Sequence, residues 1–232
     1  MEKREAQGSF TMQVIIAALN EEEGIGPTIV ELKEYLGKAK FLVVDGNSVD
    51  KTAEVAKSLG AEIVFQDGRD KGDAFAKAIE HIDKDTDYVI ITDADFTYPA
   101  KCVPEMIQLL EKNPRIGMVC GNRFTEDLDN RALHDLFYFG NRVIAFTHNF
   151  LNGVQLADPL TGLRVVRAEI LRNWKVKSKG FDLEVELNHR VEREGFGIME
   201  ISIQYRERLG KKKLGVRHGA EILRRILLET TN

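Results

Sequence analysis

The chain has 232 residues, of which 43% are hydrophobic and 30% are charged, and its net charge is −4. This composition excludes disordered and fibrous proteins and suits one large α/β domain or two small ones. Cys102 and Cys120 lack the spacing of metal ligands, and a disulfide framework is not expected, which favours a reducing cytoplasm.

No stretch of the sequence approaches the ~20 apolar residues that span a bilayer, and no signal peptide is visible. Residues 1–11 are mostly polar, and we expect them to be a disordered tail or a remnant of expression. No linker, repeat or low-complexity tract divides the rest, so we expect a single domain over 12–232 that is soluble or peripheral to a membrane.

Four short apolar runs alternate with helical patterns in the first half of the chain, at 14–19, 41–44, 61–65 and 88–91. Continuous apolar runs of this length are typical of parallel strands that are covered on both faces. Repeated strand–helix–strand units predict an open, doubly wound sheet with right-handed crossovers. Ligands of such sheets bind at the carboxyl ends of the strands.

The second half of the chain is less regular. Its patterns predict a long, aromatic-rich helix over 131–152, a turn and strand over 158–167, a strand over 198–205 and a closing helix over 218–229. Residues 181–192 fit both a strand and a helix, and their glutamates favour a helix.

Polar residues follow each of the four strands in the first half, at 20–23, 45–50, 68–72 and 93–95. Helix capping explains any one of these groups, because Asp, Asn and Ser are good N-caps. Capping alone does not explain four consecutive strand ends that carry carboxylates, glycines and a lysine. The pattern therefore predicts a ligand site along this edge of the sheet.

Asp93 and Asp95 form the sharpest of these groups, two carboxylates that directly follow a buried strand. They can converge on one hard divalent cation, and Mg²⁺ and Mn²⁺ prefer oxygen ligands and share their shell with substrate phosphates. Such a cation would neutralise charge on a departing diphosphate. An Asp-x-Asp sequence is common by chance, and its place after the strand gives it weight.

Two other groups suggest contacts with a nucleotide. Glycines at 68 and 72 let the backbone approach a phosphate, and Lys71 adds positive charge, although the spacing is not that of a Walker loop and a solvated turn is the alternative. Polar groups at Asp45, Asn47 and Ser48 can hold a base and ribose, and the alternative is an N-cap at Ser48 or Asp50.

The ordered motifs resemble the family 2 glycosyltransferases of the GT-A fold. These motifs are Ala18-Leu19-Asn20-Glu21, Val43-Val44-Asp45-Gly46-Asn47-Ser48, Lys71-Gly72-Asp73-Ala74 and Asp93-Ala94-Asp95. Downstream motifs resemble the polyprenyl-phosphate sugar synthases, the group of the dolichol-phosphate mannose synthases. They are Gly121-Asn122-Arg123, Asp158-Pro159-Leu160-Thr161-Gly162, Gly180-Phe181 and the stretch from Tyr205 to Leu214. The resemblance covers about residues 12–225.

The resemblance implies a Rossmann-like α/β/α sandwich with a mostly parallel sheet. It implies metal-dependent transfer of a hexose from GDP-mannose or UDP-glucose to a polyprenyl (dolichyl) phosphate. The implied donor-binding residues are Ala18, Asn20, Glu21, Asp45, Asn47, Ser48, Lys71, Asp93, Ala94 and Asp95. The implied ligands of Mg²⁺ or Mn²⁺ are Asp93 and Asp95, which act in catalysis with Arg123 and Arg208. The implied acceptor-binding residues are Arg123, Arg206, Arg208 and Lys213.

The chain departs from the family pattern at two positions. Gly46 stands where many relatives carry a second acid, and Lys212 stands where the family has a serine. The resemblance also implies that 131–152 is a helix at the membrane interface and that 206–232 forms an acceptor loop and a C-terminal helix.

Positive charge crowds the end of the chain, where the stretch from Arg206 to Arg225 holds eight Lys or Arg and two acids. Basic residues near anionic lipid contribute roughly 1 kcal/mol each, so we expect peripheral docking at the inner face of the cell membrane rather than a plain solvated surface. Nucleic acid is not an expected partner, because the net charge is negative and no recognised binding module is present.

Three other functions stay open. A soluble glycosyltransferase would use a hydroxyl acceptor, with Glu184 or Glu186 as a general base, although surface glutamates on a helix are the favoured interpretation. A nucleotidyltransferase would carry a glycine-rich loop after the first strand, where this chain has Asn20-Glu21-Glu22-Glu23. A non-catalytic nucleotide-sugar binding module is the third. We expect Asp158 to shape a turn that closes the site.

Overall fold

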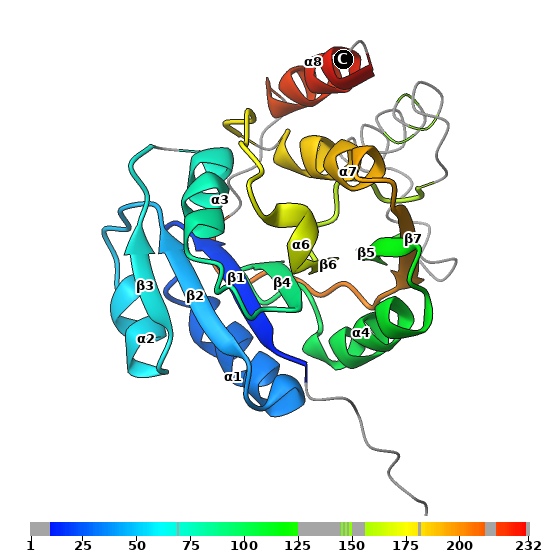
Figure 1. Ribbon diagram of the computed structural model, residues 1–232. Helices are drawn as coiled ribbons and strands as arrows, with labels where there is room; N and C mark the ends of the chain where they lie inside the picture. Colours follow the sequence, from blue (N-terminus) through cyan, green and yellow to red (C-terminus); the bar gives the residue numbers. More distant parts are fainter. Residues whose placement is uncertain are drawn as a thin grey trace, which may run out of the picture.

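The structure is a computed structural model, and it describes residues 10–68, 70–124, 145, 147, 149, 156–180, 182–211 and 217–230. Within these ranges helices lie on both faces of a central sheet (Figure 1). The predicted α/β class with a mostly parallel sheet is confirmed.

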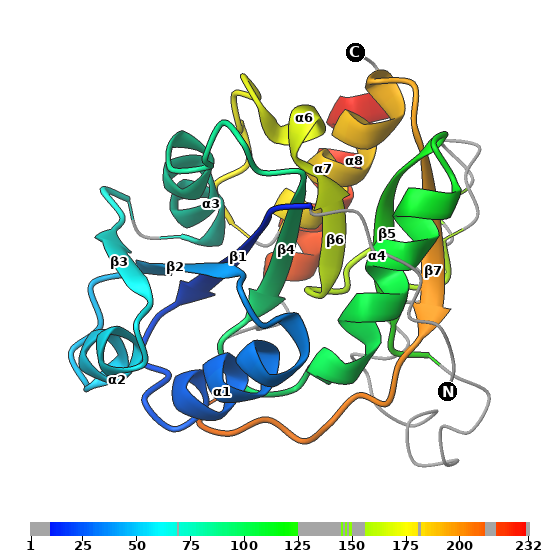
Figure 2. The ribbon, with the colours of Figure 1, turned by 60° about the horizontal axis from the view of Figure 1, so that its bottom comes forward.

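The described strands form one seven-stranded sheet in the order β3-β2-β1-β4-β6-β5-β7, which Figure 2 shows from left to right. Their bounds are β1 (Met12–Ala18), β2 (Lys40–Asp45), β3 (Glu62–Phe65), β4 (Tyr88–Asp93), β5 (Ile116–Asn122), β6 (Arg164–Arg167) and β7 (Gly197–Ser202). Strands β3, β2, β1 and β4 are parallel. Strand β6 is antiparallel to both its neighbours, and β7 pairs in parallel with β5.

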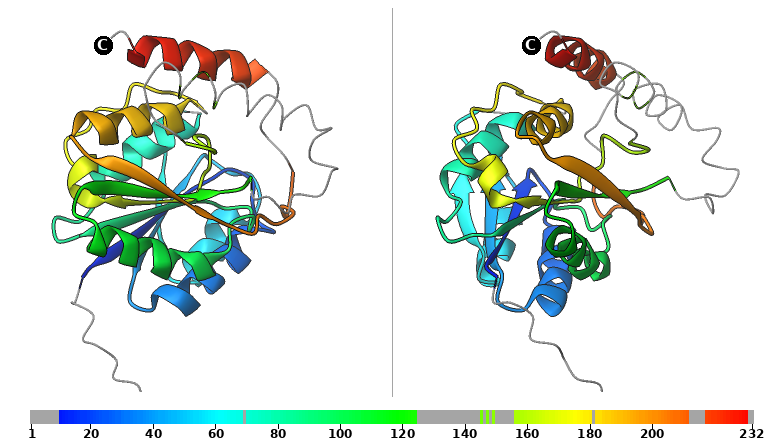
Figure 3. Two further views of the ribbon diagram at one scale, coloured as in Figure 1. Left: turned by 90° about the vertical axis from the view of Figure 1, so that its right-hand side faces the viewer. Right: turned by 45° about the vertical axis from the view of Figure 1, so that its right-hand side comes forward.

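Two helical layers cover the sheet (Figure 3). One layer holds α1 (Ile25–Leu36), α2 (Thr52–Ser58) and, after a 3-10 turn at Ala100–Cys102, α4 (Val103–Lys112). The other holds α3 (Lys71–Glu80), α6 (Ala168–Leu171) and α7 (Leu183–Arg193). Helix α8 (Arg217–Thr230) packs outside α7 through Ile222 and Ile226.

The apolar runs of the sequence become strands because both of their faces are buried. Successive strand residues point to opposite faces, so Ile16 and Val43 enter the core beneath α1 and α4, whereas Ile15 and Val44 enter the core beneath α3 and α7. This double burial explains why these strands read as continuous apolar runs without alternation.

The second half of the chain meets most of the predictions. The helix predicted over 181–192 is α7, the closing helix is α8, and the strand after the turn is β6. The strand predicted over 198–205 ends at Ser202, because the chain then leaves the sheet. Of the helix predicted over 131–152, only 145, 147 and 149 are described, and these three are helical.

Both cysteines are free, as expected. Among the residues that the structure describes, no helix has the length and apolar character needed to cross a membrane.

The carboxyl ends of β2, β1 and β4 meet at one edge of the sheet. Ala18 pairs with Asp45 on one side of β1, and Ala17 pairs with Asp93 on the other side. The polar groups predicted at successive strand ends are therefore brought together by the strand order.

Candidate active site

Hydrogen bonds join the loop after β1 to the loop after β2. The Asn20 amide donates to Ser48 Oγ at 2.9 Å, and the Glu21 amide donates to Thr52 Oγ1 at 2.8 Å. Asn20 Oδ1 accepts from the Val49 amide at 2.8 Å. Asn20 has a positive φ of 48°, which non-glycine residues seldom adopt and asparagine tolerates best. The two loops therefore form one wall of the site.

Asp45 ends β2 in a fully buried position. Its Oδ1 accepts from the Ser48 amide at 2.6 Å, and its buried Oδ2 has no hydrogen-bond partner among the described residues. Asn47 Nδ2 donates to the Gln66 carbonyl at 3.4 Å. The N-cap position of α2 is Lys51 rather than Ser48 or Asp50, but Asp50 Oδ1 accepts from the amide of Thr52, the first residue of the helix, at 3.0 Å.

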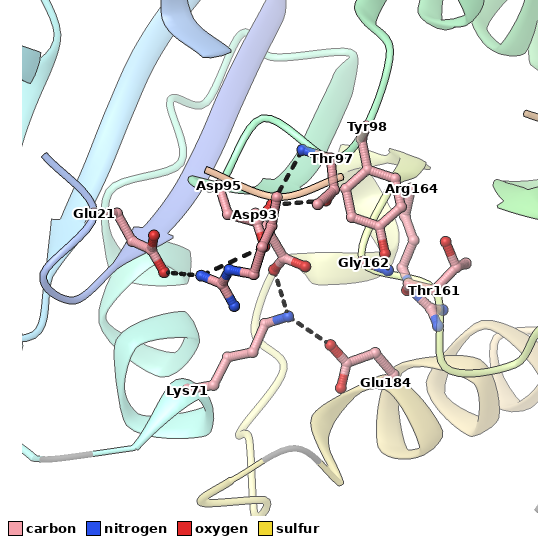
Figure 4. A network of polar contacts seen from close by, with 11 residues as sticks. Glu21, Lys71, Asp93, Asp95, Thr97, Tyr98, Thr161, Gly162, Arg164 and Glu184 are labelled. Carbon is pink, nitrogen blue, oxygen red and sulfur yellow. Dashed lines mark hydrogen bonds and ion pairs between the residues drawn. The ribbon is translucent and has the colours of Figure 1, made fainter. Parts of the chain in front are cut away.

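Asp93 is the last residue of β4 and faces Lys71 and Glu184 (Figure 4). Its Oδ1 accepts from Lys71 Nζ at 2.8 Å. Burial opposes its ionisation, but the charge and hydrogen bond of Lys71 hold the pKa of Asp93 below its usual range. A Cβ atom at Gly162 would lie 2.4 Å from Asp93 Oδ2, so only glycine lets this carboxylate pack where it does.

Asp95 lies two residues further along, and it is buried. Its Oδ1 accepts from the Thr97 hydroxyl at 2.6 Å, and its Oδ2 lies 3.7 Å from an Arg208 nitrogen. Burial raises the pKa of Asp95, and the negative charge of Asp93 raises it further. Ala94, between the two, is buried. A cation placed between the carboxylates would relieve this repulsion.

Lys71 begins α3, and its ammonium joins Asp93 of strand β4 to Glu184 of helix α7. Its Nζ lies 2.7 Å from Glu184 Oε1 as well as 2.8 Å from Asp93. Burial alone would lower the pKa of Lys71, but the charges of Asp93 and Glu184 raise it above its ordinary value. The sequence placed Lys71 near a donor phosphate and did not reveal Glu184 as its partner.

The expectation of surface glutamates on α7 is wrong. Glu184 and Glu186 are 6% and 3% exposed. Glu186 Oε2 accepts from the Lys177 and Ser178 amides at 3.1 and 2.5 Å and so fixes the loop that precedes α7. The sequence carried no signal for this burial, because seven of the eleven residues of α7 are polar or charged and a glutamate on such a helix reads as solvated.

Arg123 follows β5 and pairs with Asp158 in the bidentate geometry that fixes a guanidinium most firmly. Its Nε and one terminal nitrogen lie 2.6 and 2.7 Å from the two carboxylate oxygens, and its guanidinium lies 5.5 Å from the Tyr205 ring centre. Glu200 on β7 accepts from the Asp158 amide at 2.7 Å. Sequence reasoning expected Asp158 to shape a turn and missed Glu200.

The segment after β7 crosses over the loop that carries Asp95. The Leu209 amide donates to the Asp95 carbonyl at 3.0 Å, and the Arg206 amide donates to the Thr97 carbonyl at 3.0 Å. Arg208 donates to Glu21 Oε1 at 2.7 Å, which places its charge beside Asp95.

Arg206 points elsewhere, because it forms two hydrogen bonds of 2.7 and 2.6 Å with Glu31 on α1. Its guanidinium also lies 4.6 Å from the centre of the Phe96 ring. The structure thus brings Asp93, Asp95, Lys71 and Arg208 together and sets Arg206 apart, while Lys213 lies outside the described residues.

Asp93 and Asp95 fit a divalent cation that is completed by its substrate. No group of three or more potential ligands among His, Cys, Asp and Glu occurs in the described part of the chain. Mg²⁺ is commonly held by one or two carboxylates together with substrate phosphates and water. Two neighbouring carboxylates whose repulsion disfavours ionisation of Asp95 match that donor set.

Comparison with known proteins identifies the family of this chain. The family model described as glycosyl transferase family 2 matches residues 13–174. A dolichyl-phosphate hexose transferase of Haloferax volcanii is 32% identical over 206 residues, which cover 88% of this chain and 86% of that protein. Glycosyltransferase AglJ of the same organism is 34% identical over 175 residues, which cover 75% of this chain and 56% of that protein.

Solved structures of glucosyl-3-phosphoglycerate synthase from Mycobacterium tuberculosis share the fold. Its complex with Mg²⁺ and UDP has a TM-score of 0.75 at 20% identity and covers 96% of this chain and 80% of that chain. Its complex with Mn²⁺, UDP and glucosyl-3-phosphoglycerate has a TM-score of 0.73 at 18% identity, covering 96% and 81%. The GT-A fold is confirmed, and the chain belongs to glycosyl transferase family 2 and is a glycosyltransferase.

Proposed function

We propose that this glycosyltransferase moves a hexose from a nucleotide-diphospho-sugar, GDP-mannose or UDP-glucose, to a polyprenyl (dolichyl) phosphate with inversion. The observation that carries the proposal is the meeting of two carboxylates, Asp93 and Asp95, with cations from three distant segments at one strand end. Carboxylates hold a metal ion, and surrounding cations receive phosphates. The name of the relative that is 32% identical supports the lipid acceptor.

The donor lies along the joined loops that follow β1 and β2. The unpartnered Oδ2 of Asp45 offers an acceptor to a base N–H once the loop opens to admit the nucleotide. Asn20, Glu21, Asn47 and Ser48 line the same wall and hold its shape through their mutual hydrogen bonds. The diphosphate then reaches Asp93 and Asp95.

Mg²⁺ or Mn²⁺ on Asp93 and Asp95 would supply neutralisation of the charge that develops on the departing diphosphate. Lys71 and Arg208 lie beside these carboxylates and add fixed positive charge on either side. Preorganised charge of this kind needs no rearrangement at the moment of reaction.

The acceptor approaches from the side of Arg123 and Arg208. Arg123 is fixed by Asp158 and Tyr205, so its position is set before the acceptor phosphate arrives. A lipid phosphate is already anionic near neutral pH, so orientation matters more than a strong base. Its oxygen attacks the anomeric carbon, the bond to the diphosphate breaks with its electron pair on the leaving oxygen, and the configuration inverts.

We place the enzyme peripherally at the inner face of the cell membrane, where a long-chain acceptor resides. Of the eight Lys or Arg from Arg206 to Arg225, three pair with carboxylates of the fold, which are Arg206, Arg208 and Arg225. The other five support this placement, since a cluster of basic residues binds anionic headgroups. Leu227 and Leu228, on the outer helix α8, are 58% and 42% exposed and offer apolar contact to the bilayer.

The test mixes the protein with Mn²⁺ or Mg²⁺, UDP-glucose or GDP-mannose, and a short polyprenyl phosphate in detergent. Free nucleotide and lipid-linked sugar are both measured. Asp95→Asn is expected to abolish transfer, whereas Asp85→Asn, an exposed aspartate before β4 at the opposite end of that strand, is a matched control that keeps it.

Lipid glycosylation that needs metal and Asp95 supports the proposal and names the donor. Nucleotide release that depends on metal but gives no lipid product overturns the lipid acceptor and favours a hydroxyl acceptor. Lipid glycosylation that continues in the presence of EDTA overturns the metal.

A further inference from the structure

Lys71 holds two carboxylates at once, one from each side of the site (Figure 4). Its Nζ lies 2.8 Å from Asp93 Oδ1 on β4 and 2.7 Å from Glu184 Oε1 on α7. The side chains of Lys71 and Glu184 are only 15% and 8% exposed, so this pair is largely removed from water. Removal of one partner from a buried ion pair leaves an uncompensated buried charge, which costs far more free energy than the loss of a surface pair.

The place of Lys71 in its helix is unfavourable for a purely structural lysine. It is the first residue of α3, where the partial positive charge of the helix repels a cation. The same end of the helix lies against the α7 layer. The Gly72 amide donates to the Lys179 carbonyl at 2.6 Å, and a Cβ at Gly72 would lie 2.1 Å from the Ser178 carbonyl oxygen.

Lys71 and Glu184 therefore belong to one packed unit. Glu186 accepts the amides of the loop at Lys177 and Ser178, and that loop is bonded in turn to the start of α3. Asp93 comes from the sheet instead. A change at Asp93 can leave the contact between Lys71 and Glu184 in place.

The two oxygens of Asp93 are not equivalent. Oδ2 packs against Gly162 so closely that a Cβ there would lie 2.4 Å away. Oδ1 accepts a hydrogen bond from Lys71 Nζ at 2.8 Å. A cation that binds Asp93 through Oδ1 meets the Lys71 ammonium 2.8 Å from the same oxygen, so the two like charges compete for this carboxylate.

We propose that Lys71 is a resident cation on Asp93 that gives way to the divalent metal, and that Glu184 is the positioning residue that receives it. This inference rests on the proposed metal-dependent function. In the absence of metal, Lys71 neutralises Asp93. When metal arrives, Glu184 keeps the displaced ammonium paired, which a buried charge requires, and holds it next to the diphosphate.

The test measures Mn²⁺ affinity without nucleotide, by the loss of the free Mn²⁺ signal in electron paramagnetic resonance at pH 7.5. Lys71→Met removes the competing cation and is expected to tighten Mn²⁺ binding about tenfold, which corresponds to about 1.4 kcal/mol. Glu184→Gln leaves Lys71 to Asp93 alone and is expected to weaken Mn²⁺ binding about as much.

Matched controls come from the same helices. Lys77→Met lies further along α3, and its ammonium pairs with exposed Asp67 and Glu80. Glu192→Gln lies eight residues beyond Glu184 on α7, about 12 Å away along the helix. Neither change is expected to alter Mn²⁺ affinity. Circular dichroism melting shows which variants are folded.

The double variant Lys71→Met with Glu184→Gln keeps the test decisive, because it does not leave the buried Glu184 carboxylate without its cation, as Lys71→Met alone does. Glu184 acts only through Lys71 in this proposal, so the double variant is expected to bind Mn²⁺ as tightly as Lys71→Met. If both single variants weaken Mn²⁺ binding, or the double variant binds as weakly as Glu184→Gln, the inference is overturned while the metal site stands. If the wild type binds no Mn²⁺, with or without UDP or GDP, the proposed function itself is overturned.

Discussion

Gly24 sets the distance between α1 and the loop that carries Asp95, and this makes Gly24→Ala a sharp test of the site. A Cβ at Gly24 would lie 2.5 Å from the Ala94 carbonyl oxygen and 2.7 Å from Asp95 Cα. Gly24 has φ −95° and ψ −33°, which alanine adopts without strain. The whole effect of the substitution is therefore steric.

The clash involves main-chain atoms, so no rotamer change relieves it. Ordinary contact begins at 3.4 Å, so the carbonyl and the new methyl must separate from 2.5 Å by about 0.9 Å. Overpacking of this kind costs about 1–3 kcal/mol of stability. A displacement of about 1 Å in a catalytic group lowers the rate by about 100-fold. We therefore expect Gly24→Ala to lose about two orders of magnitude in kcat/KM.

Gly26→Ala is the matched control in the same helix. Its Cβ would meet Val55 Cγ1 at 3.3 Å, a side-chain atom that can shift, and alanine favours the helix by up to about 1 kcal/mol. Both variants are measured by nucleotide release from the sugar donor and by thermal melting. A folded Gly24→Ala variant with the activity of Gly26→Ala would refute the view that this contact positions Asp95.

Three further predictions follow from buried charges. Glu186→Gln leaves loop amides without a full acceptor and is expected to cost about 1–3 kcal/mol in denaturant unfolding. Arg123→Lys loses the bidentate contact with Asp158 and is expected to lower transfer to the lipid at least about tenfold, with less effect on donor hydrolysis. Burial lowers the pKa of His189 to about 4 and raises that of Glu192 to about 7. On acidification from pH 7 to 5, the shift of His189 destabilises the fold and the shift of Glu192 stabilises it, so the stability of the wild type is expected to change little. Glu192→Gln keeps only the effect of His189 and is expected to lose on the order of 2 kcal/mol of unfolding free energy over this range, measured by urea unfolding.

The sequence was sufficient to predict the parts of the fold that local burial determines. Strands β1, β2 and β4 are buried on both faces, and their apolar runs predicted them within a residue or two. The rule that ligands bind at the carboxyl ends of parallel strands then brought Asp45 and Asp93 to one edge, and the register confirms that they flank β1. The pattern of apolar residues predicts burial well, because residues of a strand or helix are buried at regular intervals along the chain.

Which charged side chains pair with one another could not be predicted from periodicity. The bond between Arg206 and Glu31 joins residues 175 positions apart, and the bond between Lys71 and Glu184 joins residues 113 apart. A glutamate on a helix reads as solvated unless the cation that pairs with it is known. The antiparallel direction of β6 likewise depends on the connection that precedes it, which no periodicity encodes.

The charge pairs of the site explain how a cluster of buried polar residues can be stable before its substrate arrives. Asp93 pairs with Lys71, Glu21 with Arg208, and Asp158 with Arg123, so each of these carboxylates meets a cation from a distant segment. A lone buried charge would cost several kcal/mol, whereas a pair with good geometry recovers most of that cost. A divalent cation and a diphosphate bring charges of both signs into the same space. In the proposed reaction the metal would take a carboxylate while the phosphates would take the released ammonium or guanidinium. The donor would then enter by exchange of partners, which would keep these three carboxylates and their cations paired.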